Sequence, residues 1–152
     1  MKFFDTHAHI GLIYEDPIEQ LRVIQQAKQA GVKRIVSINN SLLDFKKVYA
    51  NLKAMSGVYH AVGVAPMEVS HPGKDWQQTI IDGLKLPNVV AVGETGLDYY
   101  KAFGDKRSQT ELFITQLEIA KKYDKPVIIQ NRDAGKDVFN ILKERIPPAG
   151  AI

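Results

Sequence analysis

Short apolar runs alternate with longer amphipathic stretches along the chain. The apolar runs have the length and composition of buried β-strands, and they cover residues 2–7, 33–38, 58–64, 89–93 and 126–129. Between them, apolar residues recur at three- and four-residue intervals, which is the spacing of one helix face. These stretches predict helices at about 16–31, 41–55, 75–84, 108–123 and 134–145.

Capping signals mark where several of these helices begin. Asp16-Pro17 combines a favoured N-cap residue with a proline at the first helical position. Ser41-Leu42-Leu43-Asp44 and Ser108-Gln109-Thr110-Glu111 both have the spacing of a capping box. Pro147-Pro148 ends the last helix, and residues 149–152 have the composition of the start of another strand.

Regular alternation of strands and helices predicts an α/β protein built from parallel βα units. The strands are continuously apolar, as expected for a sheet that is covered on its faces. The length of 152 residues and the lack of an evident linker predict one domain over residues 1–152.

Composition narrows the classes of function. The net charge of +3 is too small and too dispersed to predict a nucleic-acid partner, although it is compatible with a phosphate-bearing substrate. No apolar run approaches the roughly 20 residues that span a bilayer, and the N-terminus lacks a signal-peptide pattern, so we expect no membrane partner and a cytoplasmic location. Cysteine is absent, so any metal ion here would use histidine and carboxylate ligands.

The strongest candidate chemistry lies at the ends of the first and fourth strands. His7 and His9 are two residues apart and would project from the same face of a strand. Glu94 follows five apolar residues directly, where a carboxylate is poorly solvated unless a cation meets it. Because the ends of parallel strands share one rim, we predict that these three side chains converge as metal ligands and that Glu94 is also catalytic. The alternatives are a chance pair of surface histidines and a glutamate that caps a turn.

Other strand-end residues are weaker candidates. Arg132 has the geometry to hold a substrate phosphate with two hydrogen bonds, or to form a surface ion pair. Tyr99 and Tyr100 provide rings that would stack on a base or pack internally. Asp5 is either an acceptor for a ligating imidazole or a turn residue.

Three segments together resemble the TatD family of metal-dependent deoxyribonucleases. They are Asp5-Thr6-His7-Ala8-His9, Gly93-Glu94-Thr95-Gly96-Leu97-Asp98-Tyr99-Tyr100 and Pro126-Val127-Ile128-Ile129-Gln130-Asn131-Arg132-Asp133-Ala134. The resemblance covers essentially the whole chain. It implies a TIM-type (β/α) barrel that hydrolyses phosphodiester bonds of DNA with a divalent metal ion (Mg, Mn or Zn). It also implies that His7 and His9 bind one metal ion and that Glu94 bridges to a second.

The chain departs from the family pattern at three positions, Ala65, Met67 and Gln130. Gln130 stands where family members usually carry a histidine ligand of the second metal ion. Residues 63–67 read Gly-Val-Ala-Pro-Met, whereas the family segment is usually Gly-x-His-Pro-His. The remaining family ligands would lie beyond Ile152, and a full barrel takes about 250 residues, so we expect about five of eight βα units and a domain truncated at its C-terminal end.

These departures leave alternatives to a working nuclease. One is a degenerate, non-catalytic relative that keeps the scaffold and one metal ion. Another is a different amidohydrolase, such as a deaminase or lactonase, because His-x-His on a first strand is widely shared. An incomplete barrel also exposes two sheet edges, which predicts self-association of the isolated chain.

Overall fold

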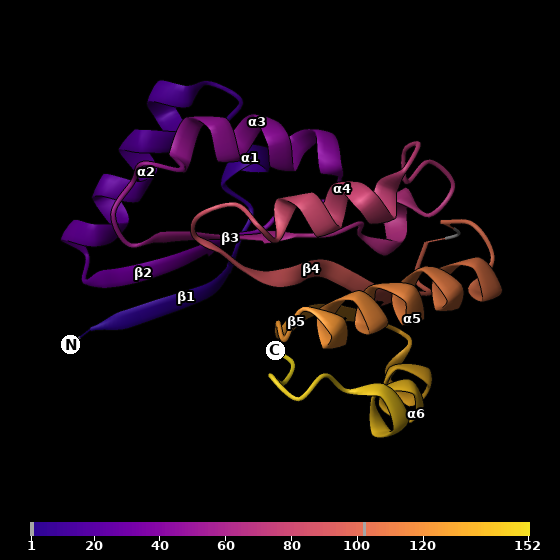
Figure 1. Cartoon of the computed structure of the whole chain (residues 1–152). Helices are drawn as coiled ribbons and strands as arrows, with labels where there is room; N and C mark the ends of the chain where they lie inside the picture. The colour runs from indigo at the N-terminus through magenta and orange to yellow at the C-terminus, as the bar shows by residue number, and fades with distance from the viewer. Residues whose placement is uncertain (1, 102) are drawn as a thin grey trace.

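Five parallel strands form one sheet in the order in which they occur along the chain (Figure 1). The computed structural model describes residues 2–101 and 103–152. The strands are β1 (Phe3–Ala8), β2 (Val32–Ser37), β3 (Val58–Val62), β4 (Val89–Asp98) and β5 (Val127–Arg132). Their parallel pairing confirms the βα organisation that the hydrophobic pattern predicts.

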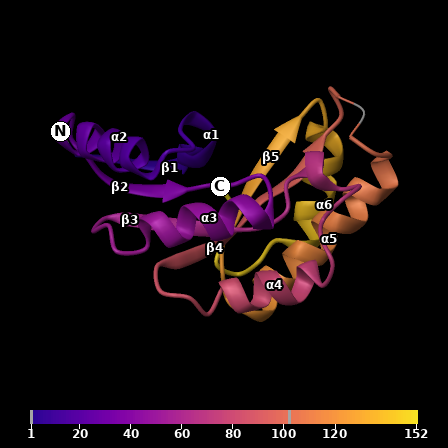
Figure 2. The same cartoon turned by 90° about the horizontal axis from the view of Figure 1, so that it is seen from above.

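Each strand is followed by helical structure that returns the chain to the start of the next strand (Figures 1 and 2). The helical segments are α1 (Ile10–Ile13), α2 (Pro17–Gln29), α3 (Leu42–Leu52), the 3₁₀ turn η1 (Pro66–Glu68), α4 (Trp76–Gly83), α5 (Lys106–Lys122) and α6 (Gly135–Arg145). Each of the longer helices from α2 to α6 contacts the next one along the chain. No helix in the described residues is both long and apolar enough to cross a bilayer.

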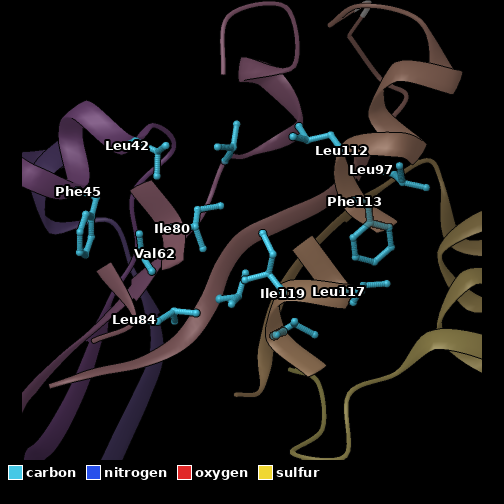
Figure 3. Packing of buried hydrophobic residues seen from close by; sticks show 14 of the residues in the cluster. Leu42, Phe45, Val62, Ile80, Leu84, Leu97, Leu112, Phe113, Leu117 and Ile119 are labelled. Carbon is cyan, nitrogen blue, oxygen red and sulfur yellow. The ribbon is translucent and has the colours of Figure 1, made fainter. Parts of the chain in front are cut away.

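The two faces of the sheet carry different cores. The largest apolar cluster lies between the sheet and α3 to α6, with Phe113, Leu117 and Ile80 fully buried (Figure 3). A smaller cluster contains strand and loop residues but no helix residues, and its buried members are Val36, Ile38, Ala61, Ala91 and Ile128. Strand alternation places these residues opposite the helix-covered face, as in the interior of a barrel.

The helix starts follow the predicted caps in two of three cases. Asp16 caps α2 by accepting a hydrogen bond from the Ile18 backbone N–H at 2.8 Å, and Ser41 caps α3. The capping box predicted at Ser108 is wrong. Helix α5 begins at Lys106, and Asp105 caps it by accepting hydrogen bonds from both the backbone N–H and the hydroxyl of Ser108.

Strand β3 ends two residues earlier than predicted because a side chain takes over its pairing. The buried amide of Gln116 on α5 accepts from the Val64 backbone N–H and donates to the Val64 carbonyl, both at 2.9 Å. Gln109, about two turns earlier on the same face of α5, holds the backbone N–H and carbonyl of Asp98 in the same way. These two glutamines attach α5 to the ends of β3 and β4.

Strands β4 and β5 both run further than predicted. Their pairing continues from Thr95 opposite Ile129 to Asp98 opposite Arg132, so the polar segment that follows the apolar run is still strand. The expected loop after β1 contains the short helix α1, because the carbonyl of His9 accepts hydrogen bonds from Leu12 and Ile13. Ala151 pairs in parallel with Val127, which agrees with a strand beginning near 149–152.

Candidate metal centre

His7 and His9 lie at the carboxyl end of β1, where the strand is irregular. Between Asp5 and Ala8, β1 has one residue more than the facing segment of β2, which is the signature of a bulge. The Asp5 carboxylate accepts a hydrogen bond from the His7 backbone N–H at 3.0 Å, so it supports the bulge and not an imidazole. His9 then forms the N-cap of α1.

Glu94 is aimed by a second irregularity, in β4. From Val92 to Thr95, β4 advances three residues while β5 advances two, so one extra residue re-aims the side chains there. A little further along, the backbones of β4 and β5 approach so closely that a Cβ on Gly96 would overlap the Gln130 carbonyl oxygen. Gly96 also has φ of +133°, which other residues rarely adopt. The result is a Glu94 carboxylate inside β4, four residues before the strand ends, that is only 4% exposed.

The three side chains meet as predicted from the sequence. The Nε2 atoms of His7 and His9 are 3.1 Å apart. His7 Nε2 lies 3.2 Å from one Glu94 oxygen, and His9 Nε2 lies 3.5 Å from the other. Two ligand atoms of a tetrahedral metal ion with bonds of about 2.05 Å are about 3.3 Å apart, so these separations match the edges of a coordination polyhedron.

Burial shifts the pKa of His9 and the pKa of Glu94 in opposite directions. Desolvation, and secondarily the charge of His7, lowers the pKa of His9, which favours the neutral imidazole that binds metal ions. Desolvation raises the pKa of Glu94; His7 opposes this rise and the neighbouring Asp98 adds to it. A divalent cation would offset the cost of ionising this buried carboxylate.

Two atoms of the cluster lack a hydrogen-bond partner among the described residues. They are Oε2 of Glu94 and Nδ1 of His9, both buried. A buried carboxylate oxygen without a donor costs free energy, and a bound cation removes that cost for Glu94. The donor set, its spacing and the orphaned oxygen therefore fit one divalent metal ion.

Next to this cluster, the buried Asp98 and the half-buried Gln130 form a hydrogen-bonded pair. Gln130 Nε2 donates to Oδ2 of Asp98 at 2.6 Å, and the Tyr100 backbone N–H donates to Oδ1 at 3.0 Å. Asp98 is 1% exposed, and its backbone is held by Gln109. The sequence alone shows no partner for Asp98, because Gln130 lies 32 residues away on another strand.

Arg132 and the two tyrosines lie beyond this pair. The guanidinium carbon of Arg132 lies 3.8 Å from the centroid of the Tyr100 ring, and both side chains are exposed. The Tyr99 hydroxyl donates to Asp137 of α6 at 2.9 Å, and Lys106 lies over the ring at 4.1 Å. The Tyr99 hydroxyl therefore links the end of β4 to α6. The Tyr100 ring is exposed and lies against the Arg132 guanidinium. The substrate contact predicted for Tyr99 stays a prediction.

A model of the family described as TatD related DNase matches residues 4–152. The chain belongs to the TatD family. An uncharacterized metal-dependent hydrolase of Bacillus subtilis, YabD, is 35% identical over 93% of this chain and 55% of its own length. A putative deoxyribonuclease of Danio rerio, tatdn3, is 32% identical over 93% of this chain and 58% of its own length.

The solved structures give the same family at the level of the fold. The crystal structure of YJJV, a TatD homolog from Escherichia coli, superposes with a TM-score of 0.83 at 30% identity, over 94% of this chain and 56% of the other. The five strands and their helices are thus consecutive βα units of a TIM-type barrel, as predicted. The chain spans little more than half the length of the relatives it matches.

The TatD pattern is altered at β3 as the sequence indicates. Ala65 is fully buried and Met67 lies in the η1 turn, so neither of these two positions supplies an imidazole. His60 on the same strand faces the helices, fully buried against the Tyr49 ring, and neither ring nitrogen has a hydrogen-bond partner in the described residues. His71 is exposed. Neither histidine belongs to the cluster of His7, His9 and Glu94.

Proposed function

We propose that this TatD-family chain binds a divalent metal ion through His7, His9 and Glu94 and acts in the hydrolysis of phosphodiester bonds of DNA. The observation that carries the proposal is the meeting of two Nε2 atoms and one buried carboxylate at ligand spacing. Membership of the family supports the chemistry, since relatives of this chain are named metal-dependent hydrolases and a putative deoxyribonuclease.

The roles of the residues follow from their places. His7 and His9 bind in their neutral forms, and the Glu94 carboxylate brings negative charge to the ion. When bound, a divalent ion polarises a phosphoryl oxygen and lowers the pKa of a water molecule. Arg132 offers a phosphate two parallel N–H donors at the same rim, and the Tyr100 ring next to it offers a base a stacking face.

A second function is a metal-binding TatD relative that does not hydrolyse its ligand. The observation that favours it is the Asp98–Gln130 hydrogen bond, because an amide stands where the family pattern has a further ligand and it brings no charge to the site. The buried Ala65 at the end of β3 points in the same direction. In this case metal binding would be retained and cleavage lost.

One experiment separates the two functions. The chain is loaded with Mg²⁺, Mn²⁺ or Zn²⁺ and incubated with an end-labelled single-stranded DNA oligonucleotide and, in parallel, with RNA of the same sequence. The nuclease proposal expects cleavage that depends on the metal ion, is abolished in His9→Ala and is unchanged in the exposed control His71→Ala. Metal binding without cleavage of either strand supports the non-catalytic relative, and absence of metal binding contradicts both.

A further inference from the structure

The carboxylate of Asp98 differs from that of Glu94 in one decisive respect. Both oxygens of Asp98 already accept a hydrogen bond from the protein, one from the Gln130 amide at 2.6 Å and one from the Tyr100 backbone at 3.0 Å. Oε2 of Glu94 accepts none in the described residues. One buried carboxylate is therefore open to a cation, and its neighbour four residues along β4 is already satisfied.

The Asp98–Gln130 pair is held in place from several sides. Gln109 binds both the N–H and the carbonyl of Asp98, at 2.9 and 3.0 Å. Gln130 lies opposite Gly96 in the pairing of β4 with β5. Because Gly96 has no side chain, the two backbones approach closely there. A second cation at Asp98 would have to break a short hydrogen bond and turn the amide around. It would gain only a neutral oxygen, which is a weaker ligand than imidazole for a borderline metal ion.

We infer that this chain holds one divalent metal ion, at His7, His9 and Glu94, and that the Gln130 amide occupies the place from which a second ion would reach Asp98. The inference rests on the proposed function, because it concerns the same centre. It specifies how many ions the described residues can hold and names the residue that sets the number.

Metal stoichiometry tests the inference without recourse to activity. The full chain is titrated with Zn²⁺ and, separately, with Mn²⁺, and bound metal is measured by calorimetry and by elemental analysis after dialysis. We expect one ion per chain for the wild type. Gln130→His releases Asp98 and adds an imidazole, so we expect two ions per chain.

Two matched variants control for side effects. Asn131→His adds an imidazole at the neighbouring exposed position, and we expect it to keep one ion. Gln130→Met removes the amide donor without adding a strong ligand, and we expect it to keep one ion as well. A circular dichroism spectrum and a melting curve show whether each variant is folded. If Gln130→His does not fold, Gln130→Glu takes its place: it replaces the amide by a carboxylate ligand of the same size, and we expect two ions per chain.

The outcomes separate this inference from the proposed function. Two ions on the wild type, or a single ion on folded Gln130→His, would overturn the role given to Gln130 while leaving a metal-dependent hydrolase intact. No ion on the wild type would overturn the metal centre itself, and the proposed function with it.

Discussion

The Nε2 atoms of His7 and His9 lie 3.1 Å apart, and both face the buried carboxylate of Glu94. Bulges in β1 and β4 bring the three groups together from strands that are not neighbours in the sheet. In the absence of a cation, such a cluster buries a carboxylate at a cost. A positive ion between the three side chains would offset this cost.

The Gln116 amide is the feature of the fold that a substitution tests most cleanly. It satisfies both backbone groups of Val64 at the end of β3, and it is fully buried. We expect Gln116→Leu to lower the free energy of unfolding by about 2–4 kcal/mol, because it leaves a buried N–H and a buried carbonyl without partners. Urea denaturation of the folded chain measures this loss. Gln77→Leu, on the exposed side of α4, should change it by less than about 0.5 kcal/mol.

The hydrogen bonds between Gln116 and Val64 show which parts of the fold follow from the local sequence and which do not. The strands and longer helices follow from local hydrophobic periodicity, and Asp16 and Ser41 follow from local capping chemistry. Gln116 lies 52 residues from the strand end that it completes, and nothing near it distinguishes it from a surface glutamine. Ser108 has the spacing of a cap, but Asp105, three residues earlier, has the same capping chemistry and caps the helix instead.

The buried His60 side chain makes the free energy of unfolding depend on pH. Burial lowers its pKa from 6.5 to about 4. The unfolded chain therefore takes up this proton first as the pH falls, and stability decreases between pH 6.5 and pH 4, by about 3 kcal/mol over the whole interval. Denaturant titrations at pH 7 and pH 5 should show a loss of about 2 kcal/mol from this group. In His60→Leu that part of the loss should disappear, and an unchanged pH dependence would show that His60 does not cause it.

We expect Arg132 to contribute to the affinity for a single-stranded oligonucleotide. Its guanidinium stacks on the exposed Tyr100 ring at 3.8 Å, so its planar face and its donors are both fixed. We expect Arg132→Ala to weaken binding of a single-stranded oligonucleotide by about tenfold, which is about 1.4 kcal/mol. Arg132→Lys should recover only part of this, because an ammonium group keeps the charge but loses the stack. Fluorescence anisotropy at fixed ionic strength measures both, with Arg22→Ala on exposed α2 as the control; equal affinities for all variants would remove Arg132 from the substrate site.

The free edge of β1 predicts self-association. Among the described strands β1 pairs with β2 alone, and next to this edge Phe3 and Phe4 are 50% and 54% exposed. Unpaired strand edges flanked by apolar side chains favour association. Light scattering coupled to size exclusion should give a mass above that of one chain, and Phe4→Lys should lower it. A single, cooperatively unfolding monomer would contradict this prediction.

The candidate site divides between what the sequence predicts and what only the fold supplies. The grouping of His7, His9 and Glu94 is predictable from the strand-end rule. Regular alternation does not aim these side chains, because His9 lies beyond β1 and because β1 and β4 each contain a bulge. The satisfied state of Asp98 is not predictable, since it depends on a hydrogen bond across β4 and β5 and on the close approach at Gly96. Similarly, only the packing of α6 distinguishes Tyr99, bonded to Asp137, from the exposed Tyr100.

The most direct measurement is anomalous diffraction at the zinc edge from crystals of this chain grown with Zn²⁺. The proposed metal centre predicts a peak about 2.0–2.2 Å from Nε2 of His7, Nε2 of His9 and an oxygen of Glu94. We expect this peak to vanish in Glu94→Gln crystals. A peak elsewhere, or none at these three side chains in zinc-saturated crystals, would contradict the metal centre.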